Sequence, residues 1–405
     1  MHIWIVSLFD PTPLDNTKRG RYISIAAECN KLNNKITYFS STFRHSTRIQ
    51  SYEETHTVKI NDDYEVVFIL TQPYHKNISF KRLSSYRGFT KNLNHYIRNQ
   101  SCPDLVLIAY PPIFPAYWLT KWAKRNGIPL VVDIIDTWPK NLLRLAPKHF
   151  KWLFKIFLFP LYYESRVILK NCSGVIGISD QNIAWAKSYG FSSFKTGVFW
   201  PAVPFKEIRE KIDNYTKQLQ PNRDKKLKLI YAGSLGQTYD IPIILKAAEI
   251  LGKKHPGKSE FLIAGSGYYR ELVLEYVNKC ENIKYLGRID HNDLLFYYAS
   301  SDVGLAQYPR DATQSITYKF FDYLSAGLPI LNSLKSEMAV LTEKYCVGFN
   351  NPPGDTDQLV MNIEKFLFHN SLLEEYKRNA LILASNKGDN EVVYKELVNF
   401  LESFN

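Results

Sequence analysis

The strongest constraint on the fold is the alternation of short apolar runs with helical patterns along most of the chain. Helical spacing of apolar residues predicts helices at 18–33, 80–99, 114–126, 148–170 and 181–189. Strands are predicted around them at 2–8, 35–40, 65–70, 104–109, 129–135, 174–178 and 194–199. Strands and helices in this order form a parallel sheet wrapped by helices, so the first half is predicted to be α/β.

A second series of the same kind begins after residue 226. Strands are predicted at 227–232, 260–264, 283–286, 302–306, 329–331 and 346–348, most of them separated by helices. The last helical patterns, at 356–369, 372–384 and 391–403, add no strand. Both halves are therefore predicted to be doubly wound, Rossmann-like α/β domains in tandem.

Prolines and a run of charge interrupt the alternation at residues 201–226 and predict a linker there. The expected organisation is a first domain at 1–200, a second domain at 227–385, and a helix at 386–405 that packs back across the junction. Because open parallel sheets bind ligands at the carboxyl ends of their strands, the two domains are expected to face each other across a cleft.

Length and composition favour an ordinary soluble protein of two domains. A chain of 405 residues exceeds the size at which single cores usually stop growing, and it is 45% hydrophobic and 22% charged. Five scattered cysteines form no C-x-x-C pair and predict reduced thiols. The first nine residues lack a basic leader pattern, and no apolar run is long enough to span a membrane. We therefore predict a cytoplasmic location.

The positive charge of the chain is concentrated in its first half. The net charge is +12, and residues 1–200 hold 26 Lys and Arg against 13 Asp and Glu, an excess of 13. Residues 201–405 hold 25 against 26, so the second half is nearly neutral. This asymmetry predicts an anionic partner for the first domain: a nucleic acid, a membrane surface or an acidic substrate.

Residues 311–331 form the most informative stretch for function. A helix is predicted from about Ile316 to Ala326, with Ser315 as its N-cap and Gly327 just beyond its end. Its core face is formed by Ile316, Phe320 and Leu324, while its second face is formed by Lys319, Asp322, Tyr323 and Ala326.

The second face of this helix suits a nucleoside diphosphate. The free amides of a helix N-terminus, with Lys319 one turn in, would bind the phosphates, and Asp322 would bind the ribose behind them. The other interpretation is a surface pair between Lys319 and Asp322 at i and i+3, with no ligand.

Three turns of the second half resemble sites where backbone amides approach a ligand. Strand-to-helix turns are predicted around Gly233, Ser234 and Gly236 and again around Gly265 and Gly267. Neither turn has the complete dinucleotide fingerprint, and ordinary tight turns are the alternative. A third turn ends at Arg288, which would meet a base or phosphate or would be a plain surface arginine.

One acidic pattern of the second half argues against a metal site. The D-x-D pattern at Asp355 and Asp357 follows Pro-Pro-Gly and opens a helix, so N-capping explains it. We predict no protein metal site and no cofactor.

Two loops of the first half contain candidate residues for chemistry. Asp136 follows the strand at 129–135 and lies beside Trp138, where an indole would exclude water from a carboxylate; capping of the next helix is the alternative. Gly20 and Arg21 open the first helix, where a ligand would approach its N-terminus, or they form a surface turn. Asp133 lies inside the strand and is expected to be structural.

Taken in order, these stretches resemble glycosyltransferase family 4, retaining enzymes of the GT-B fold, over nearly the whole chain. In the first half the resemblance rests on YFSSTFRHSTR, YPPIFPAYW and IPLVVDIIDTWPK. In the second half it rests on IYAGSLG, FLIAGSGYYREL, IKYLGRI and SITYKFFDYLSAGLPIL. The bacterial members that build surface polysaccharides or lipid-linked glycans are the most similar.

This resemblance implies that residues 1–200 form the acceptor-binding domain and residues 227–385 the nucleotide-sugar-binding domain. It also implies roles for individual residues. Asp322 matches the second acid of the family's E-x7-E motif and would bind the ribose hydroxyls; Lys319 would bind the diphosphate. Gln314 stands where the motif has its first Glu, and Asp136 is the nearest candidate for the loop residue of the first domain. Ser315, Gly233, Ser234, Gly236, Gly265, Gly267 and Arg288 are assigned to the donor side, and Gly20, Arg21 and Trp138 to the acceptor side.

The implied reaction is transfer of a sugar, with retention, from a nucleotide-diphosphate donor to a hydroxyl of a glycan or polyprenyl-diphosphate-linked acceptor in cell-surface polysaccharide synthesis. Two other classes stay open. A nucleotide-sugar epimerase would share the architecture. A nucleic-acid-binding protein would explain the basic half, although no recognition module is present and no nucleic acid partner is expected.

Residues 148–163 combine basic and aromatic side chains. Lys148, Lys151 and Lys155 fall at i, i+3 and i+7, and they are surrounded by Trp152, Phe154, Phe157 and Phe159. This composition is typical of a helix in a bilayer interface, and a core helix with a solvated lysine edge is the alternative. Because the excess of positive charge lies in the same half, we predict peripheral binding to the anionic inner face of the cytoplasmic membrane.

Overall fold

The computed structural model describes residues 1–15, 19–76, 79–145, 148–219 and 226–404. The chain divides into two compact units. Unit 1 consists of Met1–Trp200 and Val393–Asn405, and unit 2 consists of Pro201–Val392. Within these described ranges, no helix is both long enough and apolar enough to cross a membrane.

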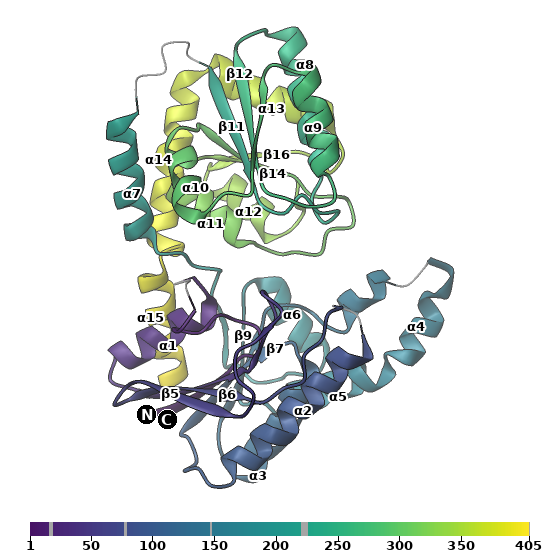
Figure 1. Ribbon diagram of the computed structural model, residues 1–405, viewed down its shortest axis with the longest axis vertical. Helices are drawn as coiled ribbons and strands as arrows, with labels where there is room; N and C mark the ends of the chain where they lie inside the picture. The colour runs from purple at the N-terminus through teal and green to yellow at the C-terminus, as the bar shows by residue number, and fades with distance from the viewer. Residues whose placement is uncertain (16–18, 77–78, 146–147, 220–225, 405) are drawn as a thin grey trace. The chain divides into compact units, whose positions relative to one another are not determined.

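Unit 1 is built on an eight-stranded sheet (Figure 1). Its strands are β1 (His2–Val6), β2 (Lys35–Ser41), β5 (His56–Asn61), β6 (Tyr64–Ile69), β7 (Leu105–Tyr110), β8 (Leu130–Ile134), β9 (Gly174–Gly177) and β10 (Thr196–Val198). Their order is β10-β9-β8-β7-β1-β2-β6-β5, and all neighbours are parallel except β5 and β6. All seven strands predicted for this half are present.

The strands that the prediction missed are either exposed or very short. Edge strand β5 pairs antiparallel with β6 and is exposed along nearly its whole length, so it has no apolar run. Strands β3 (Phe43–Arg44) and β4 (Ile49–Gln50) form a separate two-stranded hairpin after β2. Each of these two strands has only two residues, which is too short to show the period-two pattern of a half-buried strand.

Helices cover the sheet of unit 1. They are α1 (Arg21–Lys31), α2 (Phe80–Ile97), α3 (Ile113–Arg125), α4 (Lys151–Phe157), α5 (Phe159–Asn171), α6 (Asp180–Ser188) and α15 (Asn390–Glu402). Alternate residues of the central strands, such as Trp4 and Val6 of β1, form one core cluster with side chains of α2, α3, α5 and α6. Trp4 stacks on Trp122 of α3 at 5.3 Å within this core.

The helix predicted at 148–170 is divided in the structure. A 3-10 turn at Lys148–Phe150 leads into α4, and α5 begins after Leu158 with a proline in its first turn. Pro160 has no amide hydrogen to donate, so it fits the first turn of a new helix and not the middle of a long one.

Unit 2 is built on a six-stranded sheet in which all neighbours are parallel. Its strands are β11 (Leu227–Ala232), β12 (Ser259–Ala264), β13 (Ile283–Gly287), β14 (Val303–Ala306), β15 (Ile330–Asn332) and β16 (Gly348–Asn350). Their order is β13-β12-β11-β14-β15-β16. Each corresponds to a predicted strand, with the last displaced by two residues from the predicted 346–348.

The helices of unit 2 are α7 (Phe205–Gln218), α8 (Ile241–Lys254), α9 (Arg270–Lys279), α10 (His291–Ala299), α11 (Tyr318–Ser325), α12 (Glu337–Lys344), α13 (Thr356–Phe368) and α14 (Asn370–Lys387). Helix α7 occupies much of the predicted linker at 201–226. It buries Ile208 and Ile212 and is otherwise mostly polar, so its composition resembles that of a charged linker.

The last helix, α15, returns the chain to unit 1. Asn34 Nδ2, just after α1, donates to Glu402 Oε1 at 2.8 Å, and Phe400 packs on Phe199 with ring centroids 5.9 Å apart. Figure 1 shows α15 and α1 as neighbours. Unit 1 is therefore made from both ends of the chain.

Each sheet has one point at which the strand order reverses. In unit 1 the chain runs from β1 through β2 to β6 and then crosses to β7 on the other side of β1. In unit 2 it runs from β11 through β12 to β13 and then crosses to β14. Open α/β sheets bind ligands at the carboxyl ends of the strands beside such a point. The expected positions are therefore the ends of β1 and β7 and the ends of β11 and β14.

Candidate functional site

Helix α11 begins later than the sequence predicts. Its N-cap is Thr317 and its first residue is Tyr318, so the assignment of Ser315 as N-cap was wrong. The carbonyl of Ser315 instead accepts the Met338 amide at 3.2 Å and the Ser336 hydroxyl at 2.5 Å. These bonds to the start of α12 hold Ser315 outside the helix.

The end of α11 agrees with the prediction. Gly327 has a positive φ of 79°, and its amide donates to Leu324 O at 2.9 Å. The amide of Leu328 donates to Tyr323 O, also at 2.9 Å. This is the Schellman arrangement, which requires a residue in the left-handed region and so favours glycine.

Tyr323 was placed on the wrong face of the helix. Phe320 and Leu324 are buried as predicted, but Tyr323 is also fully buried. Its hydroxyl accepts the Ala232 amide at 2.9 Å and donates to Leu305 O at 3.3 Å. Gly304 makes room for the ring, because a Cβ there would lie 2.5 Å from it. Tyr323 thus fixes α11 against β11 and β14, at the reversal point of the sheet.

Lys319 projects from α11 toward the end of β11. Its ammonium nitrogen is buried and has no hydrogen-bond partner in the described part of the chain. It lies 4.2 Å from the ring centroid of Tyr231 and 4.1 Å from that of Tyr239. A Cβ on Gly233 would be only 2.8 Å from this nitrogen. The glycine loop and the lysine are therefore in direct contact, as a shared ligand site requires.

Burial lowers the pKa of Lys319 to about 7, and the nearby charge of Asp322 opposes part of that change. The two aromatic faces attract the cation but donate and accept no hydrogen bonds. Buried polar groups are nearly always hydrogen-bonded in native proteins, so an ammonium with three unused donors marks a place where a ligand is expected. An anion beside Nζ would supply the acceptors and restore the charged form.

The glycine turns pack on one another more closely than the sequence suggests. The Gly233 amide donates to Ala264 O at 3.0 Å, and the Gly265 amide donates to Gly287 O at 2.7 Å. A Cβ on Gly265 would lie 1.8 Å from Gly233 O. These two amides are therefore used inside the protein, and the prediction that they bind phosphate was wrong. Their lack of side chains serves close packing of the loops.

The remaining residues of these turns lie at the same edge of the sheet as Gly233 and Gly265. Leu235 accepts the Tyr269 amide at 2.8 Å, and a Cβ on Gly267 would lie 2.8 Å from the Leu235 carbonyl carbon. The Ser234 carbonyl accepts the Tyr231 hydroxyl at 2.6 Å, next to Gly236. The loops after β11, β12 and β13 therefore meet at one edge of the sheet.

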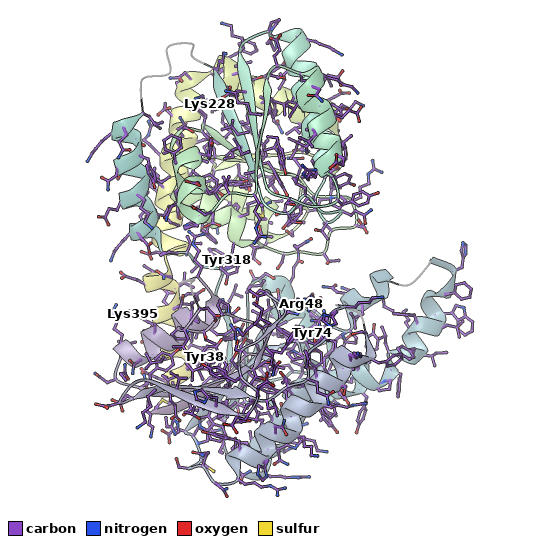
Figure 2. The ribbon with its side chains drawn as sticks, in the orientation of Figure 1. Tyr38, Arg48, Tyr74, Lys228, Tyr318 and Lys395 are labelled. Atoms are coloured by element: carbon purple, nitrogen blue, oxygen red, sulfur yellow. The ribbon has the colours of Figure 1, made fainter. Side chains whose placement is uncertain are left out.

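Three other donor-side candidates differ in exposure. Arg288 follows the last of these loops and is exposed, and Asp322 is half-buried on α11. The side-chain oxygen of Gln314 is buried and, among the described residues, has no hydrogen-bond partner. In addition to the Lys319 ammonium, this oxygen is therefore a polar group of unit 2 to which a ligand would form a hydrogen bond. Tyr318, labelled in Figure 2, is an exposed residue at the start of α11.

In unit 1 the structure brings Asp136 and Trp138 together. Trp138 Nε1 donates to one oxygen of Asp136 at 2.8 Å, and Asn141 Nδ2 donates to the other. The Trp138 carbonyl accepts the Tyr110 hydroxyl at 2.7 Å, which ties this loop to the end of β7. The carboxylate is oriented by its own loop at the reversal point of the first sheet.

The acceptor-side assignment of Gly20 and Arg21 is contradicted by the structure. Arg21 is buried and donates to Asp133 at 2.6 and 3.1 Å and to Phe199 O at 2.8 Å. A Cβ on Gly20 would lie 2.8 Å from Pro11 Cγ. Both residues therefore serve the interior of unit 1, and Asp133 is structural as expected.

The N-terminus of α1 is occupied by a carboxylate of the chain itself. The Tyr22 amide donates to Asp10 Oδ2 at 2.8 Å. Burial raises the pKa of Asp10 to about 6. An anionic ligand at this helix end would have to displace Asp10.

A cluster of side chains around Trp138 was not predicted from the sequence. Arg82 of α2 and Arg48 of the β3–β4 turn share the ring of Tyr74, and His45 bonds to its hydroxyl. His45 and Arg48 belong to the YFSSTFRHSTR run, but their common position depends on residues distant in the sequence. Over the described ranges, His, Cys, Asp and Glu side chains form no group of three or more that would hold a metal ion.

Residues 226–369 match the family model described as Glycosyl transferases group 1. The matched segment contains β11 to β16 and therefore all of the donor-side candidates. The second unit is therefore similar to a glycosyltransferase domain of group 1. The prediction that the chain is an enzyme of the glycosyltransferase class is confirmed. A comparison with curated proteins gives no match.

Solved structures similar to this glycosyltransferase match it over nearly its whole length. Sucrose-phosphate synthase from Thermosynechococcus elongatus has a TM-score of 0.73 at 13% identity and covers 99% of this chain and 98% of its own. WaaG, a glycosyltransferase involved in lipopolysaccharide biosynthesis, has a TM-score of 0.67 at 14% identity and covers 98% and 99%. HepE from Anabaena in complex with UDP has a TM-score of 0.68 at 15% identity and covers 100% of both. The predicted GT-B fold of two Rossmann-like domains is confirmed.

Proposed function

We propose that this glycosyltransferase moves a sugar, with retention, from a nucleotide-diphosphate donor to a hydroxyl group of an acceptor. The main support is the ammonium of Lys319, which is buried at the reversal point of unit 2 beside Gly233 and lacks a hydrogen-bond partner in the described ranges. A diphosphate at this position would provide both the acceptor atoms and the negative charge that the lysine needs.

Each donor-side residue then has a chemical role. Lys319 binds the diphosphate and stabilises the charge that develops on it as it leaves. Asp322, one turn along α11, binds the ribose hydroxyls, and the unsatisfied oxygen of Gln314 accepts a hydroxyl of the sugar. Arg288 and the turns containing Ser234, Gly236 and Gly267 line the donor.

The bond changes are balanced without a cofactor. The acceptor oxygen forms a bond to the anomeric carbon, the bond from that carbon to the diphosphate oxygen breaks, and the diphosphate leaves with the electron pair. The hydroxyl proton passes to an oxygen of the departing phosphate. Asp136, oriented by Trp138 and Asn141, positions the acceptor or stabilises the positive charge of the ring.

Donor binding is tested with UDP-glucose, because HepE from Anabaena was also solved in complex with UDP-glucose. Calorimetric titration of the full chain should show binding, and Lys319→Ala should weaken it roughly 10- to 100-fold, as expected for one charge-assisted contact. Lys365→Ala is the matched control, since Lys365 lies 4.4 Å from the ring centroid of Phe349 in the same unit. Equal affinities for wild type and Lys319→Ala would contradict the donor site.

For the acceptor, we propose a glycan or a polyprenyl-diphosphate-linked glycan of cell-surface polysaccharide synthesis. The similarity in fold to WaaG, a lipopolysaccharide glycosyltransferase, supports this pathway. Product analysis with lipid-linked acceptors would test it. Turnover of the donor without any acceptor would favour the epimerase alternative.

Helix α4 supports binding of the enzyme to a membrane surface. Its Trp152, Ile156 and Phe157 are 62%, 64% and 67% exposed, and Phe150 and Phe159 on either side are also exposed. A core helix is thereby excluded for this segment. Lys155 is exposed too, whereas the side chains of Lys148 and Lys151 lie outside the described residues. Large apolar side chains beside a lysine suit the interface of an anionic bilayer.

We propose that unit 1 attaches the enzyme to the inner face of the cytoplasmic membrane through α4. Trp152→Ser and Phe157→Ser should reduce co-sedimentation with anionic vesicles, and high salt should weaken the binding of wild type. Phe368→Ser is the control, because Phe368 is similarly exposed but belongs to unit 2. Equal binding of wild type to neutral and anionic vesicles, or to neither, would exclude this attachment.

A further inference from the structure

A pocket lies at the edge of the unit 1 sheet opposite to the edge that carries Asp136. Its volume is about 400 Å³, which is within the range of small-molecule sites. It lies between the last turns of α3 and α5, where β8 begins at Leu130 and Ser173 precedes β9. Asp136 follows the other end of β8, a strand of five residues, so the pocket and this carboxylate are roughly 15–20 Å apart. The pocket is therefore separate from the candidate acceptor side.

One part of the pocket lining is apolar. Ala123 of α3, Ile128 of the following loop and Leu130 of β8 line the pocket and also belong to the main core cluster of unit 1. Water against such side chains is unfavourable, and a ligand with an apolar body would displace it. This part of the pocket therefore suits a carbon skeleton and not a bare inorganic ion.

Phe404 forms an aromatic side of the pocket, and its ring is held in place by contacts within unit 1. A Cβ on Gly174 would lie 2.3 Å from Phe404 Cζ, so a larger residue there would displace the ring. Lys195 Nζ lies 4.1 Å from the ring centroid and donates to Ser403 O at 2.6 Å. Because this side is formed in advance, a ligand need not order it on binding.

Two exposed lysines add positive charge to the lining. They are Lys124 of α3 and Lys170 of α5. Lys124 Nζ donates to Asn171 Oδ1 at 2.6 Å, which holds this lysine beside the end of α5. Among the described residues, those that line the pocket include no Asp or Glu, and neither lysine forms an ion pair. The charge of the pocket is therefore not neutralised by its own lining.

A hydroxyl group adds a further donor. The Ser173 oxygen accepts the Leu130 amide at 3.2 Å, so the hydroxyl hydrogen is directed away from that amide. A hydroxyl can accept one hydrogen bond and donate another, and an anion in the pocket would accept this second bond. Two ammonium groups and one hydroxyl thus line the same pocket as the apolar side chains.

The position of the lysines has a structural explanation that does not extend to the pocket. Both lie in the last turn of a helix, where a cation complements the helix dipole. This effect needs only a charge near the helix end. It does not require a preformed aromatic side, an apolar lining and a hydroxyl donor around the same space, whereas a ligand that contains both an anionic and an apolar part does.

We propose that this pocket binds a small organic anion. The carboxylate or phosphate of the ligand lies between Lys124 and Lys170, and its apolar body packs against Ile128, Leu130 and Phe404. Because the pocket is at the opposite end of β8 from Asp136, this ligand is not the acceptor of the transfer reaction. The site is a second binding site of unit 1, and it does not depend on the proposed function.

The test uses the full chain with saturating UDP, so that an anion cannot bind at the donor site. Fluorine NMR measures binding of para-fluorobenzoate, para-fluorophenyl phosphate and the neutral para-fluorobenzamide. At least one anion should bind roughly tenfold more tightly than the amide, since only the anions pair with the two lysines. The anion that binds more tightly distinguishes a carboxylate ligand from a phosphate ligand. Equal binding of all three probes, or no binding of either anion at millimolar concentration, would overturn this inference.

Variants locate the binding. Lys124→Ala and Lys170→Ala should each weaken the better anion roughly three- to fivefold and leave the amide unchanged, and both lysines are exposed, so the fold is kept. Lys121→Ala is the matched control, because Lys121 is exposed one turn earlier on α3, contacts the Tyr117 hydroxyl at 3.3 Å and is outside the pocket lining. Wild-type affinity in both lysine variants, or an equal loss in Lys121→Ala, would refute the site.

The aromatic side is tested separately. Phe404→Ala removes the ring but no charge, so it should weaken the anions and the amide by the same factor, roughly three- to tenfold. Thermal unfolding of this variant shows whether the fold is kept. Unchanged affinity for every probe in a folded Phe404→Ala protein would place the probes elsewhere on the molecule and refute the site.

Discussion

Each unit of this glycosyltransferase contains a buried cation that can be compared with one in the other unit, and the two differ in their partners. Arg21 in unit 1 donates twice to Asp133 and once to Phe199 O. Lys319 in unit 2 lies over two tyrosine rings, and its nitrogen has no hydrogen-bond partner in the described chain. One cation is satisfied inside the protein, and the other is not.

This difference separates a structural charge from a functional one. A buried ion pair with good geometry needs nothing further, and removing one partner leaves an unpaired charge behind. A buried cation without acceptors costs stability in the free protein, and such a cost is common where a ligand completes the site. Substitutions at Arg21 and Lys319 should therefore have opposite effects on stability and on donor binding.

The largest effect is expected from Arg21→Met. Asp133 would remain buried without its partner, which costs roughly 3–5 kcal/mol of the free energy of unfolding. Thermal unfolding would show a lower transition temperature for unit 1, while UDP-glucose binding to the folded protein would stay near that of wild type. The double variant Arg21→Met with Asp133→Leu should recover much of the loss. No recovery would mean that the arginine acts through contacts other than this pair.

Lys319→Met should have the next largest effect, and mainly on function. Loss of a charge that stabilises the leaving diphosphate should lower turnover roughly 100- to 1000-fold. The same change removes a buried, unpaired ammonium, so the free enzyme should become more stable by about 1–2 kcal/mol. Steady-state kinetics and thermal unfolding on one preparation check the expected loss of turnover and the expected gain in stability. A less stable protein with normal turnover would make Lys319 a structural residue like Arg21.

Asp136→Asn should lower turnover roughly 10- to 100-fold and leave the KM for the donor nearly unchanged, because the residue acts on the acceptor side. Trp138 and Asn141 both donate to this carboxylate, so the isosteric amide loses charge and one acceptor but keeps the shape. The measurement is the dependence of rate on donor concentration. A raised KM with normal kcat would assign Asp136 to binding or to loop structure.

Local pattern predicted most of the fold. Apolar runs located the strands of both sheets, and Gly327 marked the end of α11. Edge strand β5 was missed because its side chains are mostly exposed and leave no apolar run. Tyr323 was misplaced because the space for its ring comes from Gly304, on another element.

The site was predicted only in part, because its decisive contacts join distant residues. Lys319 was expected on the donor side from its place in the helix, but the surroundings of its ammonium are the rings of Tyr231 and Tyr239, about a fifth of the chain earlier. Arg21 and Asp133 are 112 residues apart, so no local pattern shows that the arginine is already paired. Short-range spacing identifies candidate residues, and long-range contacts decide which of them remain available to a ligand.

The smallest expected effect is a dependence of donor affinity on pH. It tests the same difference between Lys319 and Arg21. Burial holds the pKa of Lys319 at about 7 in the free enzyme. A bound diphosphate would raise this pKa, because its negative charge favours the ammonium form. Above pH 7, where most of the lysine is neutral, donor binding must therefore take up a proton. UDP-glucose affinity should therefore be nearly constant below about pH 6 and fall roughly tenfold between pH 6 and pH 8. The phenols of Tyr231 and Tyr239 do not compete, because burial raises the pKa of each. In Lys319→Arg the guanidinium stays charged, so the affinity should not change over this range. An equal fall in wild type and Lys319→Arg would show that another group titrates, and the unpaired lysine would then not govern donor binding.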